Sequence, residues 1–244
     1  MIADKAAAGN NSRVMRTLAG ALVAGLLLSG CVSTVGGTAV RANNARPNPQ
    51  DVQELTESDL DRIMLSIGEL NGIAGTTQMK IASTSEEMTD NSDAVSDLDC
   101  LGAIYGAEEL VYQDTGWTVV RDEVAREPVD DNDHWVQQIA VLYPSPDDAK
   151  RFFESSSAQW KKCAGSSIQI SGSASDSEWD IDDATATETM LSQMATQRDA
   201  DGWGCQHALS FASNLTVETF ACSNDAGDEA ETIANEMIAN AAKK

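Results

Sequence analysis

The clearest hydrophobic period along the chain predicts a long helix that begins after Ser145. Apolar and small residues recur every three or four positions from Ala149 to Cys163, which is the spacing of one helix face. Ser145 suits the N-cap, Pro146 suits the first helical position, and Gly165 suits the stop. Because Cys163 ends the apolar stripe, we expect its side chain to be buried.

Runs of alternating or β-branched residues predict strands on both sides of this helix. They cover residues 116–124, 134–143, 168–170 and 179–181 and, more loosely, 185–196. Two further runs, 202–212 and 215–222, are separated only by Ser213-Asn214. That spacing predicts a β-hairpin with a two-residue turn.

Shorter helical patterns complete the expected fold. Ser66 and Glu69 have capping-box spacing before an apolar stretch, a second short helix is expected from Cys100, and a final helix is expected from about Asp228. Residues 79–100 are polar and acidic, so we expect a long loop there with no more than one strand. Runs of strands broken by isolated helices predict an α+β fold: a single domain in which an antiparallel sheet carries a few packed helices.

Residues 1–30 have the layout of a lipoprotein signal peptide. Three basic residues precede an apolar run, 18–28, that is too short to cross about 30 Å of hydrocarbon. Residues 28–31, Leu-Ser-Gly-Cys, resemble a bacterial lipobox. The resemblance implies cleavage before Cys31 and lipidation of its thiol, with acyl chains such as palmitate holding the chain on the membrane. The alternative is an ordinary secretory signal with an accidental cysteine.

Residues 31–55 are rich in small and polar residues, with Pro47-Asn48-Pro49 near the end. This composition predicts a flexible, lipid-anchored linker with a reach on the order of 25 Å. The folded domain is then expected over residues 56–244. Together these features predict a location on the extracytoplasmic face of the cell membrane.

The charge balance limits the partners. The chain has 39 Asp and Glu against 16 Lys and Arg, a net charge of −23, and loss of the basic leader makes the remainder more acidic still. Phosphate backbones repel such a chain, so nucleic-acid binding is disfavoured, and anionic headgroups would repel it as well. The lipid on Cys31, and not surface charge, must therefore hold it at the membrane.

Cysteine spacing predicts two disulfides. Lipidation of Cys31 leaves four cysteines in an exported chain, and four cysteines allow three pairings. In a hairpin with a two-residue turn at 213–214, Cys205 lies directly opposite Cys222, at a separation that a disulfide can close. Cys100–Cys163 then follows by elimination. A metal site is the alternative, and the lack of any CxxC pair in the sequence argues against it.

The sequence carries no recognisable catalytic motif: GxSxG, HExxH, GxGxxG and the phosphate-binding loop are all missing from it. With every remaining cysteine paired, no thiol nucleophile is left, so we expect no catalytic residues and no cofactor. A hydrolase with an undetected site is the remaining enzymatic alternative. The acidic stretch 130–133 lacks the glycine and distal glutamate of an EF-hand, which favours a strand-connecting turn over a calcium site.

Seven motifs that carry cysteine, tryptophan or polar residues lie in order at 65–71, 97–102, 116–118, 126–128, 132–138, 160–165 and 202–209. They resemble the PknH-type extracellular sensor domain of mycobacteria, and the lipobox makes the chain similar to the lipoprotein branch of that family (LppH-type). The likeness covers about Thr56 to the C-terminus. It implies an α+β domain with two disulfides at these four cysteines, and a cleft for an unidentified ligand without enzymatic activity.

Polar and aromatic residues of these motifs form the candidate ligand-binding set. They are Arg126, His134, Trp135, Gln137, Trp203 and Gln206. For both tryptophans the alternative is a core position at the start of a strand. The expected function is a non-enzymatic sensor or binding domain for a small molecule or other envelope ligand. The alternative is a structural lipoprotein that docks basic envelope proteins through its acidic surface.

Overall fold

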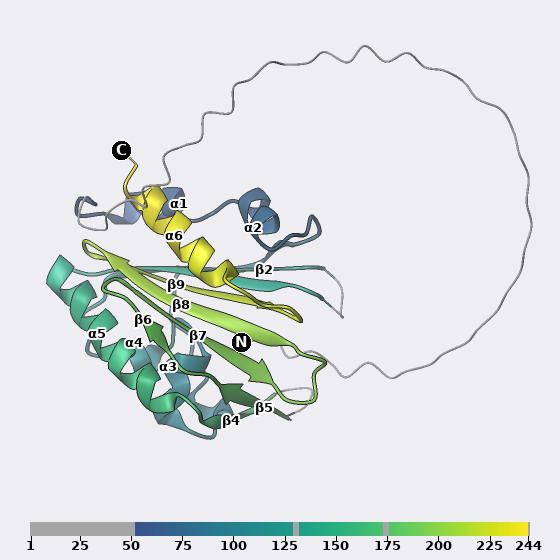
Figure 1. The fold of residues 1–244 in the computed structure, drawn as a ribbon. Helices are drawn as coiled ribbons and strands as arrows, with labels where there is room; N and C mark the ends of the chain where they lie inside the picture. Colours follow the sequence, from purple (N-terminus) through teal and green to yellow (C-terminus); the bar gives the residue numbers. More distant parts are fainter. Residues whose placement is uncertain (1–51, 129–131, 173–175, 244) are drawn as a thin grey trace, which may run out of the picture. The chain divides into compact units, whose positions relative to one another are not determined.

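The computed structural model describes residues 52–128, 132–172 and 176–243, and over these ranges the strands form one antiparallel sheet. The strand order is β1-β2-β3-β9-β8-β7-β5-β4, with the short β6 paired to β7 (Figure 1). The predicted signal peptide, Cys31 and the predicted linker up to residue 51 lie outside the described residues. The strands are β1 (Lys80–Ser85), β2 (Val119–Arg126), β3 (Trp135–Leu142), β4 (Ser167–Ser171), β5 (Asp176–Ile181), β6 (Thr185–Ala186), β7 (Met190–Gln197), β8 (Gly204–Ala212) and β9 (Leu215–Ser223).

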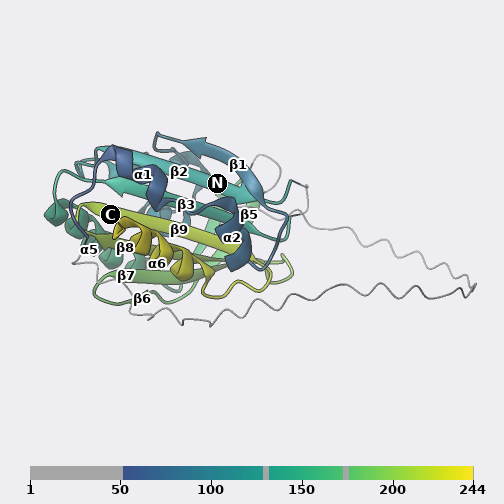
Figure 2. The ribbon, with the colours of Figure 1, turned by 90° about the horizontal axis from the view of Figure 1, so that it is seen from above.

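Helices cover both faces of the sheet (Figures 1 and 2). On one face lie α1 (Leu60–Ile63), α2 (Ile67–Ile73) and α6 (Glu229–Ala241); on the other lie α3 (Leu101–Ile104), α4 (Glu109–Tyr112) and α5 (Pro146–Cys163). Single 3₁₀ turns occur at η2 (Glu57–Asp59), η3 (Ser92–Ala94) and η4 (Leu98–Cys100).

Side chains of the central strands point alternately to the two faces of the sheet, and a hydrophobic core lies on each face. In β3, Ile139 packs on the α5 side and Ala140 on the α6 side, and β8 repeats the pattern with Leu209 and Ala208. Because helices cover both faces, every residue of β3 is buried. This explains why the sequence of β3 reads as a nearly continuous strand-forming run.

The hairpin register predicted from the two-residue turn is confirmed. Ala212 pairs with Leu215 and Cys205 pairs with Cys222 across β8 and β9. The structure contains the disulfide Cys205–Cys222 within the hairpin, and it also contains Cys100–Cys163, which joins η4 to the last residue of α5. One bridge therefore joins β8 to β9. The other joins the segment that leads into α3 and α4, which we call the helical cover, to the end of α5.

The predicted helix starts are also confirmed at α5 and α2. The Ser145 side chain accepts a hydrogen bond from the Asp148 backbone N–H, and Pro146 opens α5. Ser66 and Glu69 form the reciprocal capping box of α2, and Gly75 follows in the left-handed region at φ 72°. Cys163 is buried, as its place on the apolar stripe predicts.

Two parts of the fold depart from the sequence pattern. The helices α1 and α4 have four residues each and show too little period to be recognised, and 185–196 is two strands, β6 and β7, interrupted at 187–189. Residues 79–100 contain one strand, β1, which agrees with the expected loop with no more than one strand; β1 is an edge strand whose side chains are mostly exposed. Within the described part of the chain no helix is long and apolar enough to cross a membrane.

Candidate functional site

The six residues of the predicted ligand set do not line one common cavity, which corrects the expectation. Side chains alternate between the two faces of a strand, so Trp135 and Gln137 of β3 face the α5 side. Gln206 of β8 faces the other side, where its Oε1 accepts a hydrogen bond of 3.1 Å from the Glu231 backbone N–H in α6. Arg126 is exposed at the end of β2.

Both tryptophans of the set are core residues. Trp203 is 1% exposed and Trp135 is 4% exposed, and the Trp135 ring meets Phe220 edge to face at 6.4 Å. Gln137 is also buried, and its Nε2 donates to both carboxylate oxygens of Asp122 at 3.0 and 2.9 Å. These three side chains support the sheet from inside, which is the alternative that the sequence left open for the tryptophans.

His134, in contrast, lines a small cavity beyond the ends of β3 and β9. We call it the His134 cavity; its volume is about 220 Å³. Ala74 closes it from the end of α2, and Glu229 closes it from the start of α6. The remaining lining residues are Val136, Ala221, Cys222, Ser223 and Asp225.

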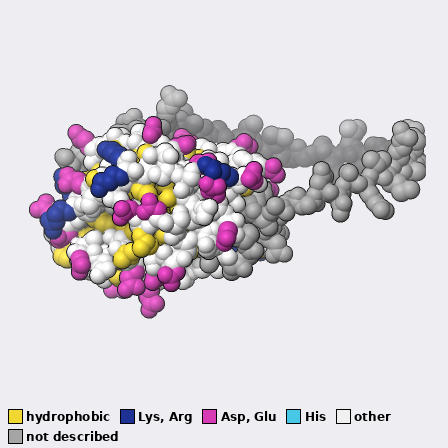
Figure 3. All heavy atoms as spheres, turned by 90° about the horizontal axis from the view of Figure 1, so that it is seen from below, with side chains coloured by type: hydrophobic (Ala, Val, Ile, Leu, Met, Phe, Trp, Pro, Cys, Tyr) yellow, Lys and Arg dark blue, Asp and Glu magenta, His cyan; other side chains and the backbone are white. Residues whose placement is uncertain are grey.

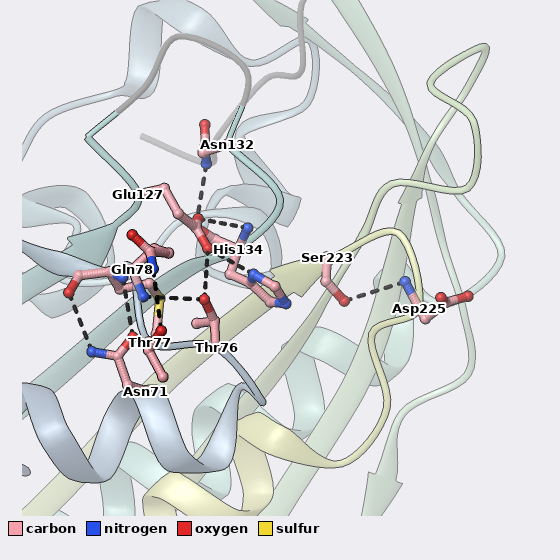
Figure 4. A network of polar contacts seen from close by, with 10 residues as sticks. Asn71, Thr76, Thr77, Gln78, Glu127, Asn132, His134, Ser223 and Asp225 are labelled. Atoms are coloured by element: carbon pink, nitrogen blue, oxygen red, sulfur yellow. Dashed lines mark hydrogen bonds and ion pairs between the residues drawn. The ribbon is translucent and has the colours of Figure 1, made fainter. Parts of the chain in front are cut away.

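A buried carboxylate fixes the His134 side chain in this cavity (Figure 4). Glu127 accepts hydrogen bonds from the His134 backbone N–H at 2.9 Å and from Thr76 Oγ1 at 3.3 Å, and it lies 2.8 Å from His134 Nδ1. When Nδ1–H donates to this carboxylate, the ring is held with Nε2 pointing away from Glu127. Acidic side chains and no lysine or arginine line this cavity, so it suits a ligand group that donates hydrogen bonds.

A much larger depression lies beside α5, and we call it the groove. One wall is the exposed side of α5, and the other consists of β6, the connection 187–189 and the tip of the β8–β9 hairpin. Its volume is about 970 Å³, at the upper end of the range for ligand sites. Its lining residues are Val52, Pro146, Asp147, Lys150, Phe153, Glu154, Ser157, Ala158, Lys161, Ala186, Thr187, Glu188, Thr189, Phe211, Ala212 and Ser213.

Apolar side chains form the floor of the groove, and charged side chains line its rim. The rings of Phe153 and Phe211 lie 4.9 Å apart between α5 and β8. Lys150 pairs with Glu154 one helical turn away, and Lys161 stands at the far end of α5. Figure 3 shows this side of the molecule, with hydrophobic side chains gathered between basic and acidic ones. Such a surface can bind an elongated apolar ligand that carries a polar end.

Asn214, in the turn of the β8–β9 hairpin, fixes one end of the groove. Its carboxamide accepts from the Leu55 backbone N–H at 2.8 Å and donates to the carbonyl oxygens of Leu55 and Tyr143 at 3.0 Å each. Tyr143 lies three residues before Pro146, the first residue of α5. The hairpin tip, the start of α5 and the first described stretch of chain are thus joined at one point.

A buried polar cluster lies between these sites, under α3 and α4. Glu218 accepts from Tyr112 Oη at 2.9 Å and from the Ala107 backbone N–H at 3.3 Å, and it lies 2.8 Å from His207 Nε2. Burial lowers the pKa of His207 and raises the pKa of Tyr112. Since each group is buried and partnered within the protein, the cluster attaches the helical cover to the sheet.

Sequence reasoning missed the groove because its walls come from segments far apart in the chain. The available signal was the exposed side of the predicted helix 146–163, where Ala158 sits among charged residues. Nothing in the local pattern shows that β6 and the hairpin tip face that side. Within the described residues, no group of three or more His, Cys, Asp or Glu side chains could hold a metal ion.

The chain is similar to proteins of one family. Residues 55–240 match the model of the PknH-like extracellular domain. The serine/threonine-protein kinase PknH of Mycobacterium bovis is 32% identical over 218 residues, which cover 89% of this chain and 36% of the kinase. For the PknH of Mycobacterium tuberculosis the identity is 32% over 194 residues, or 79% of this chain and 31% of the kinase.

A solved structure agrees with this match. The crystal structure of the extracellular domain of PknH from Mycobacterium tuberculosis is 31% identical and has a TM-score of 0.75, covering 79% of this chain and 99% of that one. This chain spans about a third of the length of the curated relatives, and the similarity to the solved structure lies in their extracellular part. On this evidence the chain belongs to the PknH-like extracellular domain family.

Proposed function

We propose that this chain is an extracytoplasmic sensor domain that binds an envelope ligand in the groove and catalyses no reaction. One observation carries the proposal: an elongated depression of about 970 Å³ with an aromatic floor on an otherwise strongly acidic, disulfide-linked domain. Large apolar depressions on a soluble surface usually mark binding sites, because exposed apolar area is unfavourable unless something covers it.

The family supports the extracytoplasmic part of the proposal. The similar solved structure is an extracellular domain, and two disulfides suit an oxidising compartment. The lipobox-like residues 28–31 support an anchor on Cys31. A domain with this much negative charge would need such an anchor to stay near anionic lipid.

Thermal unfolding of the chain without its signal peptide, carrying Cys31→Ala, tests the groove. Envelope extracts that contain the ligand should raise the melting temperature, because ligand binding to the folded state adds stability. Ala158→Trp fills the groove and should abolish the rise. Ala82→Trp, on exposed β1 at the opposite edge of the sheet, is the matched control and should leave it unchanged.

The alternative function gives a different result in the same experiment. A domain that docks basic envelope proteins through surface carboxylates should bind in a salt-sensitive way, since exposed charge interactions are screened. Ala158→Trp should also leave the binding of such a partner unchanged. If the stabilisation persists in Ala158→Trp and disappears at moderate salt, the ligand docks on the acidic surface and not in the groove.

A further inference from the structure

The folded domain receives its N-terminal linker at one end of the groove. Val52, the first described residue, is buried and lines the groove. Three residues later, Asn214 holds the Leu55 backbone by two hydrogen bonds and also holds the carbonyl of Tyr143 just before α5. The linker therefore joins the domain where α5 and the hairpin tip bound the groove, and not at a remote surface.

The groove has the length of an extended chain. Its α5 lining runs from Pro146 to Lys161, which is about 22 Å at the rise of an α-helix. The acyl chain of one leaflet spans roughly 15 Å, half of a hydrocarbon core of about 30 Å. The groove can therefore hold one acyl chain lengthwise along Phe153 and Ala158, with room for a polar group at an end.

The rim places mixed charges around the apolar floor. Lys150 is paired with Glu154, while Asp147 and Glu188 add negative charge and Lys161 adds positive charge. Both signs are present, so the rim favours a zwitterionic or neutral headgroup over a strongly anionic one. The net charge of −23 also disfavours an anionic ligand.

We propose that the groove accepts an acyl chain of a zwitterionic phospholipid taken from the bilayer to which Cys31 is anchored. This inference rests on the proposed function and names its ligand class and source. The 20 residues between Cys31 and Val52 allow a reach on the order of 25 Å, comparable with the groove itself. Anchoring thus keeps the linker end of the groove within reach of the lipid surface.

Photo-crosslinking of the anchored protein tests the source. The mature, lipidated chain is incorporated into phosphatidylcholine vesicles that contain a phosphatidylcholine with a photoreactive acyl chain. After illumination, peptide mapping should place the label on the groove face of α5 and near Phe211. Ala158→Trp should reduce labelling at least ten-fold, whereas the control Ala82→Trp should label as the wild type does.

A second arm uses Cys31→Ala protein, free in solution, with the same photoreactive phosphatidylcholine dispersed in detergent. Labelling of the groove in detergent and from vesicles supports the proposal. Labelling in detergent but not from vesicles overturns the bilayer source. A third outcome is no labelling in either arm, although envelope extracts raise the melting temperature of the wild type and not of Ala158→Trp. That outcome overturns the lipid as the ligand class and leaves the proposed function standing. No labelling and no stabilisation by extracts would contradict both.

Discussion

At the residue scale, polar side chains inside the sheet are positioned by partners that only the tertiary fold brings together. Gln137 meets Asp122 through the pairing of neighbouring strands, and His207 meets Glu218 through the hairpin. The sequence shows each of these residues in a strand-like run but does not show its partner. Gln137 is a candidate ligand contact because it is a polar residue of a family-like motif, whereas in the structure it is buried and its amide donates to Asp122.

The buried Asp122 carboxyl should make stability depend on pH. Burial raises its pKa to about 6, above the value of about 3.9 in an unfolded chain, so the folded state binds more protons between these values. Stability should therefore fall as pH rises from 4 to 6. Asp122→Asn removes this contribution, which amounts to at most about 3 kcal/mol.

Urea unfolding at pH 4 and pH 7 measures the effect. The free energy of unfolding of Asp122→Asn relative to the wild type should be higher at pH 7 than at pH 4. His207 is present in both proteins, so its own titration cancels in the comparison. An equal difference between the two proteins at both pH values would show that Asp122 titrates as an ordinary exposed carboxyl.

Gly106 is a second residue whose role depends on the packed fold. A Cβ there would lie 2.5 Å from Ile139 Cδ1 and 2.9 Å from a Phe220 ring carbon, inside the core under α3. Gly106→Ala should destabilise the domain by about 1–3 kcal/mol through overpacking. Gly72→Ala in α2 is the control, because nothing lies within 4 Å of its Cβ and alanine favours a helix. Thermal melts that rank the two variants equally would contradict the packing argument.

At the element scale, the parts with strong local signals were predictable and the parts held by tertiary contacts were not. α5 has a cap, a proline at its start and a long apolar stripe, and the β8–β9 hairpin has a two-residue turn that sets its register. α4 has only four residues and is held by the Tyr112 hydroxyl on Glu218. The groove depends on β6 lying opposite α5, and no local pattern encodes that arrangement.

The two disulfides should differ in their contributions to stability. Cys100–Cys163 spans 63 residues and Cys205–Cys222 spans 17, and a longer loop removes more entropy from the unfolded chain. Replacing the first pair with alanines should cost about 4 kcal/mol and replacing the second about 3 kcal/mol. Urea unfolding of the two double variants gives both values. A larger cost for the 205–222 pair would mean that contacts within the hairpin outweigh loop entropy.

At the scale of the whole molecule, the sheet separates two regions with different roles. The α6 side closes the core and the His134 cavity, whereas the α5 side carries the groove where the linker joins. Family membership, the disulfides and the acidic surface were all readable from motifs and composition. The site was not, because a groove is a property of the assembled surface.

The proposed anchor on Cys31 belongs to this scale, because it would hold the molecule at the membrane. Cys31→Ala should yield either unprocessed precursor or a form released from the membrane, since two or more acyl chains are needed for stable attachment. Detergent phase partitioning of cell extracts measures this, with the wild type in the detergent phase. A processed Cys31→Ala chain that still enters the detergent phase would rule out the lipid on Cys31.

Hydrogen–deuterium exchange with and without an envelope lipid extract tests most directly whether the groove is the binding site. Binding there should slow amide exchange in residues 146–161, 186–189 and 211–213 and leave the surroundings of the His134 cavity unchanged. Protection centred on the His134 cavity, or none in either region, would contradict the account.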